Sequence, residues 1–111
     1  MTIELPAMAA ARSTTRLTAD EIATYVHSLG APWHIVDARL TFITAPSSMR
    51  DSAALITQAA DIAERLHHHP EVDVGYHRLR IAITTHDCGG LTAIDFAFAS
   101  QLELWRRAQS P

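Results

Sequence analysis

Apolar residues recur along the chain with two different periods, which together predict three helices and four strands. A capping box formed by Thr18 and Glu21 begins the first helix, over about residues 19–29. Gly30 ends that helix and Pro32 prevents its continuation. The apolar residues on its inner face are Ile22, Val26 and Leu29.

Two short strands are predicted next, over 33–36 and 39–44, with Asp37-Ala38 as the turn between them. Leu40 and Phe42 alternate onto one face of the second strand. The turn lacks the Asn-Gly signature of tight hairpins, so its geometry stays open.

A long helix over about 48–67 follows, with Ser48 as its N-cap and Pro70 just beyond its end. Its predicted apolar face consists of Met49, Ala53, Ile56, Ala60 and Ala63, widened by Leu55, Ile62 and Leu66. The small residues on this face favour close packing against another helix or a sheet.

The alternation resumes over 72–76 and 78–85, where Leu79, Ile81 and Ile83 share one side. A second capping box, Thr92 with Asp95, begins a helix that extends to about 107. Its inward-facing residues are predicted to be Phe96, Ala99, Leu102 and Trp105. The order α-β-β-α-β-β-α indicates an α+β fold, a four-stranded antiparallel sheet with three helices on one face.

Composition limits the range of functions. The chain of 111 residues is long enough for one domain, which we place at 18–108 after a flexible tail over 1–17. A net charge of -3 argues against direct nucleic-acid binding. No apolar run has the roughly 18 residues of a membrane span, and no signal peptide is evident. The lone cysteine fits a reducing compartment, so we expect a cytoplasmic protein.

Histidines gather in the second half of the chain. His67, His68 and His69 come at the end of the long helix. Consecutive helical residues point about 100° apart, so at most two of the three are expected to converge. Glu64 precedes His68 by four residues and is expected to orient its ring. The alternative is that these histidines only favour the negative end of the helix dipole.

A second cluster lies at the end of the strand over 78–85. His86 stands between Thr85 and Asp87, and Thr85 and Cys88 are expected to add weak polar contacts to a ligand. Considered alone, His86 is a turn residue, Cys88 an inert small residue and Asp95 a helix cap.

A zinc site is a further alternative, since histidine and cysteine are zinc ligands. Adjacent histidines chelate one ion poorly, and the sequence has no Cys-x-x-Cys or His-x-x-x-His pair. The pattern therefore favours proton transfer by histidine, whose ordinary pKa of about 6.5 suits it to neutral pH.

The spacing of these residues resembles the pterin-4a-carbinolamine dehydratase family. The motif consists of Glu64, His68-His69-Pro70-Glu71, Tyr76, Thr85-His86-Asp87-Cys88, Gly90-Leu91-Thr92 and Asp95. The similarity is strongest over 59–95 and weaker over the rest of 33–99. The combination is far more specific than any one of its parts.

The resemblance implies an enzyme that dehydrates 4a-hydroxytetrahydropterins, such as 4a-hydroxytetrahydrobiopterin, to quinonoid dihydropterins without a metal or cofactor. It implies a pocket built by His68, His69 and His86. We assign His69 and His86 to proton transfer, and His68, held by Glu64, to orientation of the substrate. The residues expected to contact the pterin are Glu64, Pro70, Thr85, Asp87, Cys88, Trp33 and Asp95.

The resemblance also implies a homodimer or homotetramer. A non-catalytic dimerisation cofactor for transcription factors is the alternative function, because relatives of this fold serve that role. The chain departs from the family at Val72 and Val74, where an aromatic residue and an asparagine are common. Loss of the aromatic ring removes a stacking surface for the pterin.

Overall fold

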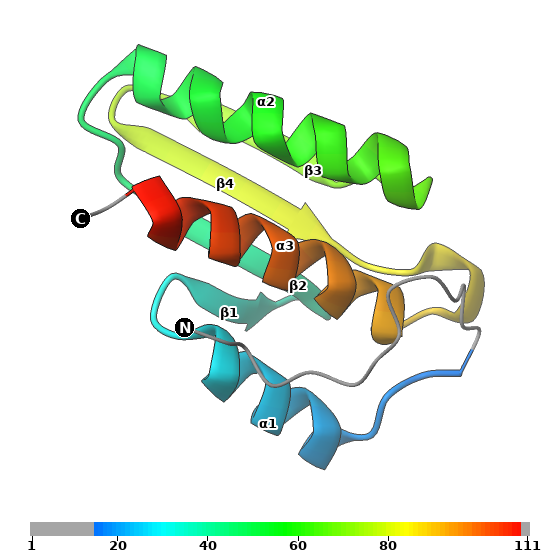
Figure 1. The fold of residues 1–111 in the computed structure, drawn as a ribbon. Helices are drawn as coiled ribbons and strands as arrows, with labels where there is room; N and C mark the ends of the chain where they lie inside the picture. The colour runs from blue at the N-terminus through cyan, green and yellow to red at the C-terminus, as the bar shows by residue number, and fades with distance from the viewer. Residues whose placement is uncertain (1–14, 110–111) are drawn as a thin grey trace.

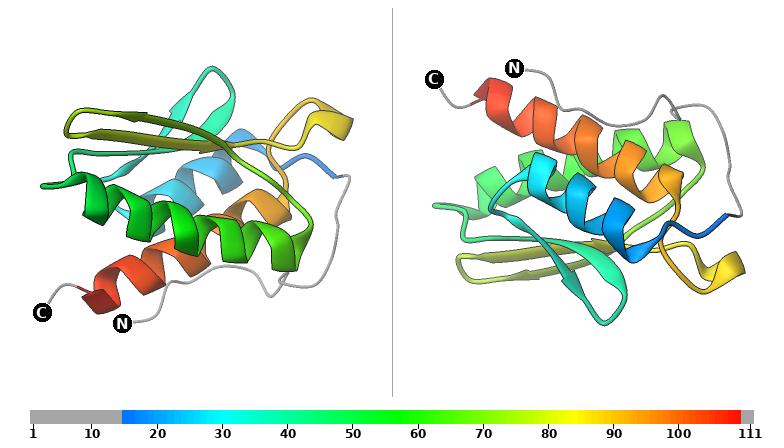
Figure 2. Two further views of the ribbon diagram at one scale, coloured as in Figure 1. Left: turned by 90° about the horizontal axis from the view of Figure 1, so that it is seen from above. Right: turned by 90° about the horizontal axis from the view of Figure 1, so that it is seen from below.

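Three helices cover one face of a four-stranded antiparallel sheet. The computed structural model describes residues 15–109. The elements are α1 (Ala19–Leu29), β1 (Trp33–Val36), β2 (Arg39–Thr44), α2 (Met49–Leu66), β3 (Glu71–Gly75), β4 (Arg78–Ile83), the 3₁₀ turn η1 (His86–Cys88) and α3 (Ala93–Gln109). Figure 1 shows α3 between α1 and α2, and in Figure 2 all three helices lie on the same side of the sheet. The predicted α+β fold and element order are confirmed.

The strand order is β1-β2-β4-β3, so the two hairpins meet along β2 and β4 and leave β1 and β3 at the edges. Phe42 lies opposite Ile81, and Leu40 opposite Ile83, which places the apolar sides of both central strands under the helices. This pairing buries the alternating residues that the sequence pattern identified.

The turn between β1 and β2 shows how the first hairpin closes without an Asn-Gly pair. Asp37 and Ala38 both have left-handed backbone angles, with φ of 52° and 62°. Two such residues in a two-residue loop form a type I′ turn, whose twist matches that of the flanking strands. A left-handed alanine is unusual, and the Thr84 hydroxyl donates a hydrogen bond of 3.3 Å to its carbonyl oxygen.

The capping boxes form to different extents. At α1, the Thr18 hydroxyl accepts from the Glu21 amide and the Glu21 carboxylate accepts from the Thr18 amide, as predicted. At α3, the Asp95 carboxylate accepts from the Thr92 amide, but the Thr92 hydroxyl pairs with Thr85 instead of with the helix. Only half of the second capping box is formed, and the Thr92 hydroxyl instead takes part in the candidate site.

The predicted inner face of α2 is partly wrong. Met49 is 64% exposed and both Ala53 and Ala60 are exposed. The buried residues are Ser52, Ala59, Ile62 and Ala63, with Leu55, Ile56 and Leu66 partly buried beside them. The pattern was ambiguous because alanine is apolar yet fits either face of the helix. Ser52 was missed because its hydroxyl marks it as polar.

The ends of the domain extend slightly beyond the prediction. Leu17, predicted to lie in the tail, donates its amide to the Leu91 carbonyl and packs against the core. The rest of that tail, residues 1–14, lies outside the described residues. In the described part of the chain, none of the helices is both long and apolar enough to cross a bilayer.

Candidate active site

The C-terminus of α2 brings the histidine triplet out of the helix. His67 has the left-handed angles φ 51° and ψ 44°, and the His68 amide bonds back to the Ala63 carbonyl at 3.0 Å. These contacts are those of a Schellman motif with histidine in place of the usual glycine. His68 and His69 therefore leave the helical path, so helical spacing does not decide which side chains meet them.

Asp95, at the first turn of α3, fixes His68. Its Oδ1 lies 2.6 Å from His68 Nε2, while its Oδ2 accepts from the Thr85 hydroxyl at 2.8 Å and the Thr92 amide at 2.9 Å. Asp95 has no exposed surface, and the side chain of His68 is 11% exposed. With Asp95 ionised, His68 Nε2 carries the proton and donates, which leaves Nδ1 for another partner. The aspartate thus sets both the position and the tautomer of the ring.

The partner predicted for His68 is wrong. Glu64 bonds His69 instead, with 2.8 Å between Glu64 Oε2 and His69 Nε2. The Schellman turn explains why Glu64 bonds His69 and not His68, because the turn rotates His68 away from the helical face that carries Glu64. Both side chains of the Glu64–His69 pair are exposed, so water weakens this pair far more than it weakens the His68–Asp95 pair.

The two histidine clusters meet in one pocket of about 220 Å³. The residues that line this histidine pocket are His67, His68, His69, Thr84, Thr85, His86 and Asp87. All three consecutive histidines border the pocket, whereas helical geometry had allowed two. His67 takes part because its left-handed backbone ends the helix.

His86 borders the pocket from a different segment, the short turn η1 that follows β4. Thr85 and Gly90 form an isolated bridge across the base of this turn, and Gly89 closes it with φ 68°. The His86 side chain is exposed and makes no hydrogen bond to another described residue. Its ring is thus free to bind a ligand.

Five of the seven residues expected to contact substrate do not line the histidine pocket: Glu64, Pro70, Cys88, Trp33 and Asp95. Asp95 and Glu64 reach it only through His68 and His69, which they bond. Pro70 is half-buried after the triplet. The Cys88 thiol lies 3.8 Å from the Thr85 carbonyl oxygen and 3.7 Å from that of Gly90, so it is directed at its own turn. Trp33 is 2% exposed in the core and packs against Phe42 with 5.1 Å between ring centroids.

Trp33 instead donates a hydrogen bond to the buried carboxylate of Glu103 in α3. Its indole nitrogen donates to Glu103 Oε1 at 2.9 Å, and Arg106 and Arg107 also donate to Glu103. Burial raises the pKa of the Glu103 carboxyl, but the hydrogen bonds from Arg106, Trp33 and Arg107 outweigh burial and lower the pKa below its usual value. Arg107 also donates to the Leu29 carbonyl, which ties α3 to the end of α1.

Two threonines at the site were not predicted. Thr84 lines the pocket, and the Thr92 hydroxyl lies 2.9 Å from that of Thr85. The sequence signalled a cap at Thr92 and Asp95, but it gave no sign that the second carboxylate oxygen reaches His68. That contact joins residues 27 positions apart.

Val72, the clearest departure from the family, lies on the edge strand β3 opposite Ile81 and is 38% exposed. It is neither a core residue nor part of the wall of the histidine pocket. Over residues 15–109, no three His, Cys, Asp or Glu side chains are arranged to hold a metal ion.

Comparison with known proteins identifies the family. The family model for pterin 4 alpha carbinolamine dehydratase matches residues 15–105. Proteins named "Putative pterin-4-alpha-carbinolamine dehydratase" include one from Solibacter usitatus, 38% identical over 90 residues that cover 81% of this chain and 94% of that protein. One from Acidobacterium capsulatum is 35% identical over 88 residues, covering 79% and 95% of the two chains.

Similarity to other relatives is more local. A protein of the same name from Chloroflexus aggregans is 52% identical over 50 residues, 45% of this chain, and the match spans about half of that relative's length (53%). A crystal structure from Brucella melitensis, titled a transcriptional coactivator/pterin dehydratase, superimposes with a TM-score of 0.74 at 29% identity, covering 81% of this chain and 97% of that one. With the family model matching most of its length, the chain belongs to the pterin-4-alpha-carbinolamine dehydratase family.

Proposed function

We propose that this protein is a dehydratase that removes water from 4a-hydroxytetrahydropterins, such as 4a-hydroxytetrahydrobiopterin, to give quinonoid dihydropterins. One observation carries the proposal: His68, His69 and His86 border a single pocket in a chain of the dehydratase family. The names of the relatives support a hydro-lyase, and the exposed histidines supply the groups that such a reaction needs.

The reaction requires one acid and one base. The bond from C4a to its hydroxyl oxygen breaks, and the hydroxyl leaves as water after it receives a proton. The proton on N5 goes to a base, and its electron pair forms the double bond between N5 and C4a. No oxidation takes place, so two positioned proton carriers suffice, each typically worth roughly 10²–10⁴-fold in rate.

We assign these two roles to His69 and His86. Both side chains are exposed to the solvent with which a proton carrier must exchange, and they approach the pocket from different segments. Glu64 bonds Nε2 of His69, so Nδ1 is the nitrogen left for the substrate. The His86 ring is unconstrained by a protein partner among the described residues and is free to follow the leaving oxygen.

His68 is the orienting residue in this proposal. Its contact with buried Asp95 fixes the ring, and a fixed donor or acceptor positions a substrate better than a mobile one. Asp95 acts through His68 and is a positioning residue. Thr85 and Asp87, which line the same pocket, are the proposed polar contacts to the pterin ring.

The proposal needs no metal or cofactor, because protonation of the leaving hydroxyl takes the place of a Lewis acid. The single cysteine supports a reducing compartment, and we place the reaction in the cytoplasm.

Stopped-flow measurement of the decay of a 4a-hydroxytetrahydropterin tests the function. The protein at micromolar concentration is expected to accelerate the decay and to yield the quinonoid dihydropterin spectrum. A decay rate identical to that in buffer, from a protein with native circular dichroism, would contradict it.

One observation favours a second candidate, a protein-interaction module. The Brucella neighbour is titled both a coactivator and a dehydratase. Here the edge strand β3 exposes Val72 and Val74, at 38% and 41%, as a partner-binding strand would. Pterin binding without turnover would favour this candidate over the enzyme.

A further inference from the structure

A second hollow lies beside the histidine pocket. This second hollow has about 200 Å³ and is lined by Asp37, Ala38, Arg39, Thr84, Thr85, His86 and Gly89. We call it the Arg39 hollow. It shares Thr84, Thr85 and His86 with the histidine pocket.

The volumes of the two hollows indicate that one ligand occupies both. Small-molecule sites usually enclose about 300–1,000 Å³. The histidine pocket, at about 220 Å³, lies below that range, whereas the two hollows combined enclose about 420 Å³ and lie within it. A bicyclic substrate with a substituent would therefore use both.

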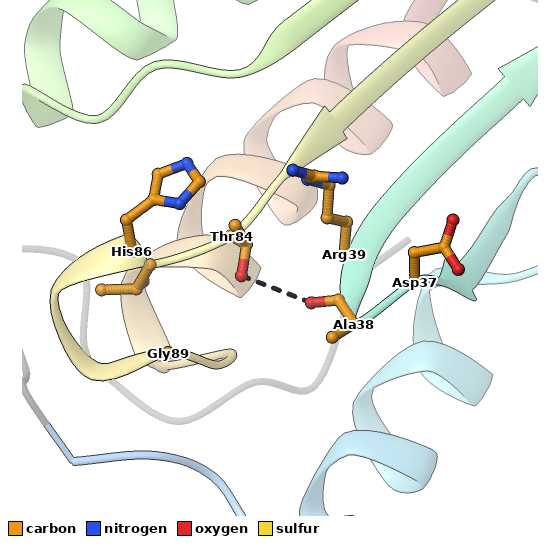
Figure 3. A pocket seen from close by; sticks show the side chains of 7 residues that line it. Asp37, Ala38, Arg39, Thr84, His86 and Gly89 are labelled. Carbon is orange, nitrogen blue, oxygen red and sulfur yellow. Dashed lines mark hydrogen bonds between the residues drawn. The ribbon is translucent and has the colours of Figure 1, made fainter.

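The wall of the Arg39 hollow is held in place. The type I′ turn between β1 and β2 forms one side, and the Thr84 hydroxyl bonds the Ala38 carbonyl across the hollow at 3.3 Å (Figure 3). Thr84 directly follows β4 and lies two residues before the candidate catalytic residue His86, so this bond holds the turn close to that residue. The hollow is thus preformed, which lowers the cost of ordering it around a ligand.

Arg39 is the charged group that this hollow offers to a ligand. In Figure 3 its guanidinium extends toward the side of His86, while the Asp37 carboxylate is turned away. The nearest acid is Glu71, whose Oε2 lies 3.5 Å from Arg39 Nη2, beyond the usual hydrogen-bond distance of about 2.7–3.2 Å. The side chain is 34% exposed, and a guanidinium has five N–H donors, so donors remain for a ligand.

We infer that the Arg39 hollow binds the substituent at C6 of the pterin and that it selects substituents bearing oxygen. A guanidinium only donates hydrogen bonds, so it favours hydroxyl or carboxylate oxygens over an alkyl group. Arg39 is thereby a specificity-determining residue of the site. The inference rests on the proposed dehydratase function.

The test compares two substrates on two variants. The substrates are 4a-hydroxytetrahydropterins with a dihydroxypropyl or a methyl group at C6. Arg39→Gln is expected to raise KM for the dihydroxypropyl substrate about three- to tenfold, the usual effect of losing one hydrogen bond, with little change for the methyl substrate and in kcat. The matched control is Arg80→Gln, because Arg80 has similar exposure and pairs with Glu71 and Asp73 but does not line the hollow.

Equal changes in KM for both substrates, or none, would overturn the inference. Failure of the proposed function is a separate outcome, in which wild type accelerates neither substrate. Equilibrium binding then tests the hollow without turnover, with 7,8-dihydrobiopterin and 6-methyl-7,8-dihydropterin as probes. The inference holds if Arg39→Gln weakens the binding of 7,8-dihydrobiopterin but not that of 6-methyl-7,8-dihydropterin. It fails if the ratio of the two dissociation constants is the same in wild type, Arg39→Gln and Arg80→Gln.

Discussion

Asp95 Oδ1 lies 2.6 Å from Nε2 of His68, and this contact joins the start of α3 to the end of α2 across 27 positions of sequence. The same carboxylate caps α3 through the Thr92 amide and accepts from Thr85 at the end of β4. One buried side chain thus ties the start of α3 to the two segments that border the histidine pocket. Its removal is expected to disturb stability and chemistry together.

Asp95→Asn tests this role. The asparagine side chain has the shape of aspartate, but only its oxygen accepts hydrogen bonds. Either the cap at the Thr92 amide or the contact with His68 is therefore lost. We expect a loss of about 1–3 kcal/mol in the free energy of unfolding and at least a roughly tenfold lower kcat in the folded fraction, because His68 loses its fixed tautomer. Urea unfolding and single-turnover kinetics measure the two effects. An exposed control is Asp61→Asn. A variant with reduced stability but unchanged kcat would mean that Asp95 is only a cap.

Glu103 is expected to make the fold sensitive to acid. Its pKa in the folded protein is lowered from the usual 4.5, despite burial, by hydrogen bonds from Arg106, Trp33 and Arg107. A lowered pKa means that the ionised carboxylate stabilises the fold at pH values above 4.5. That contribution declines as the pH falls below 4.5 and is lost once the pH passes the folded pKa.

Glu103→Gln is the matched variant for this prediction, since the amide resembles the carboxylate in shape and does not titrate. Wild type should be more stable than the variant at pH 7, by about 1–3 kcal/mol, and the difference should shrink between pH 5 and pH 2. Thermal unfolding followed by circular dichroism at several pH values measures it. A difference that is constant over this range would show that the Glu103 charge does not contribute.

Much of the fold follows from the sequence because alternation and capping are local signals. The Thr18–Glu21 box and the apolar side of β4 illustrate this. The partner of His68 could not be predicted, because a left-handed residue at His67 redirects the chain and histidine seldom marks such a turn. Trp33 was assigned to the pocket from the family resemblance, but the core holds it through Glu103. Long-range pairs of this kind leave no periodic trace in the sequence.

Metal removal provides a further test. Dialysis against a strong chelator is expected to leave both the melting temperature and the dehydratase rate unchanged, because adjacent histidines are poor chelators of a single ion. Loss of either property, restored by added zinc, would contradict the metal-free mechanism.

Assembly is predicted from exposed apolar surface. The edge strand β3 exposes Val72 and Val74, and α2 exposes Met49, Ala53 and Ala60. We expect a homodimer or homotetramer at micromolar concentration, because a domain of this size gains stability from burying such surface. Light scattering after size exclusion measures the mass. Val74→Lys should lower the mass by placing a charge on the edge strand. A wild-type mass equal to the 12.2 kDa monomer would refute this prediction.

The central claim is that the histidines of this pocket catalyse the dehydration. The most direct measurement is the stopped-flow rate of 4a-hydroxytetrahydropterin decay with His69→Ala and His86→Ala, beside wild type and the control His27→Ala, whose histidine is exposed on α1. Each pocket variant should lower kcat at least about tenfold at unchanged circular dichroism, while the control should match wild type. Wild-type rates in both pocket variants would contradict the account.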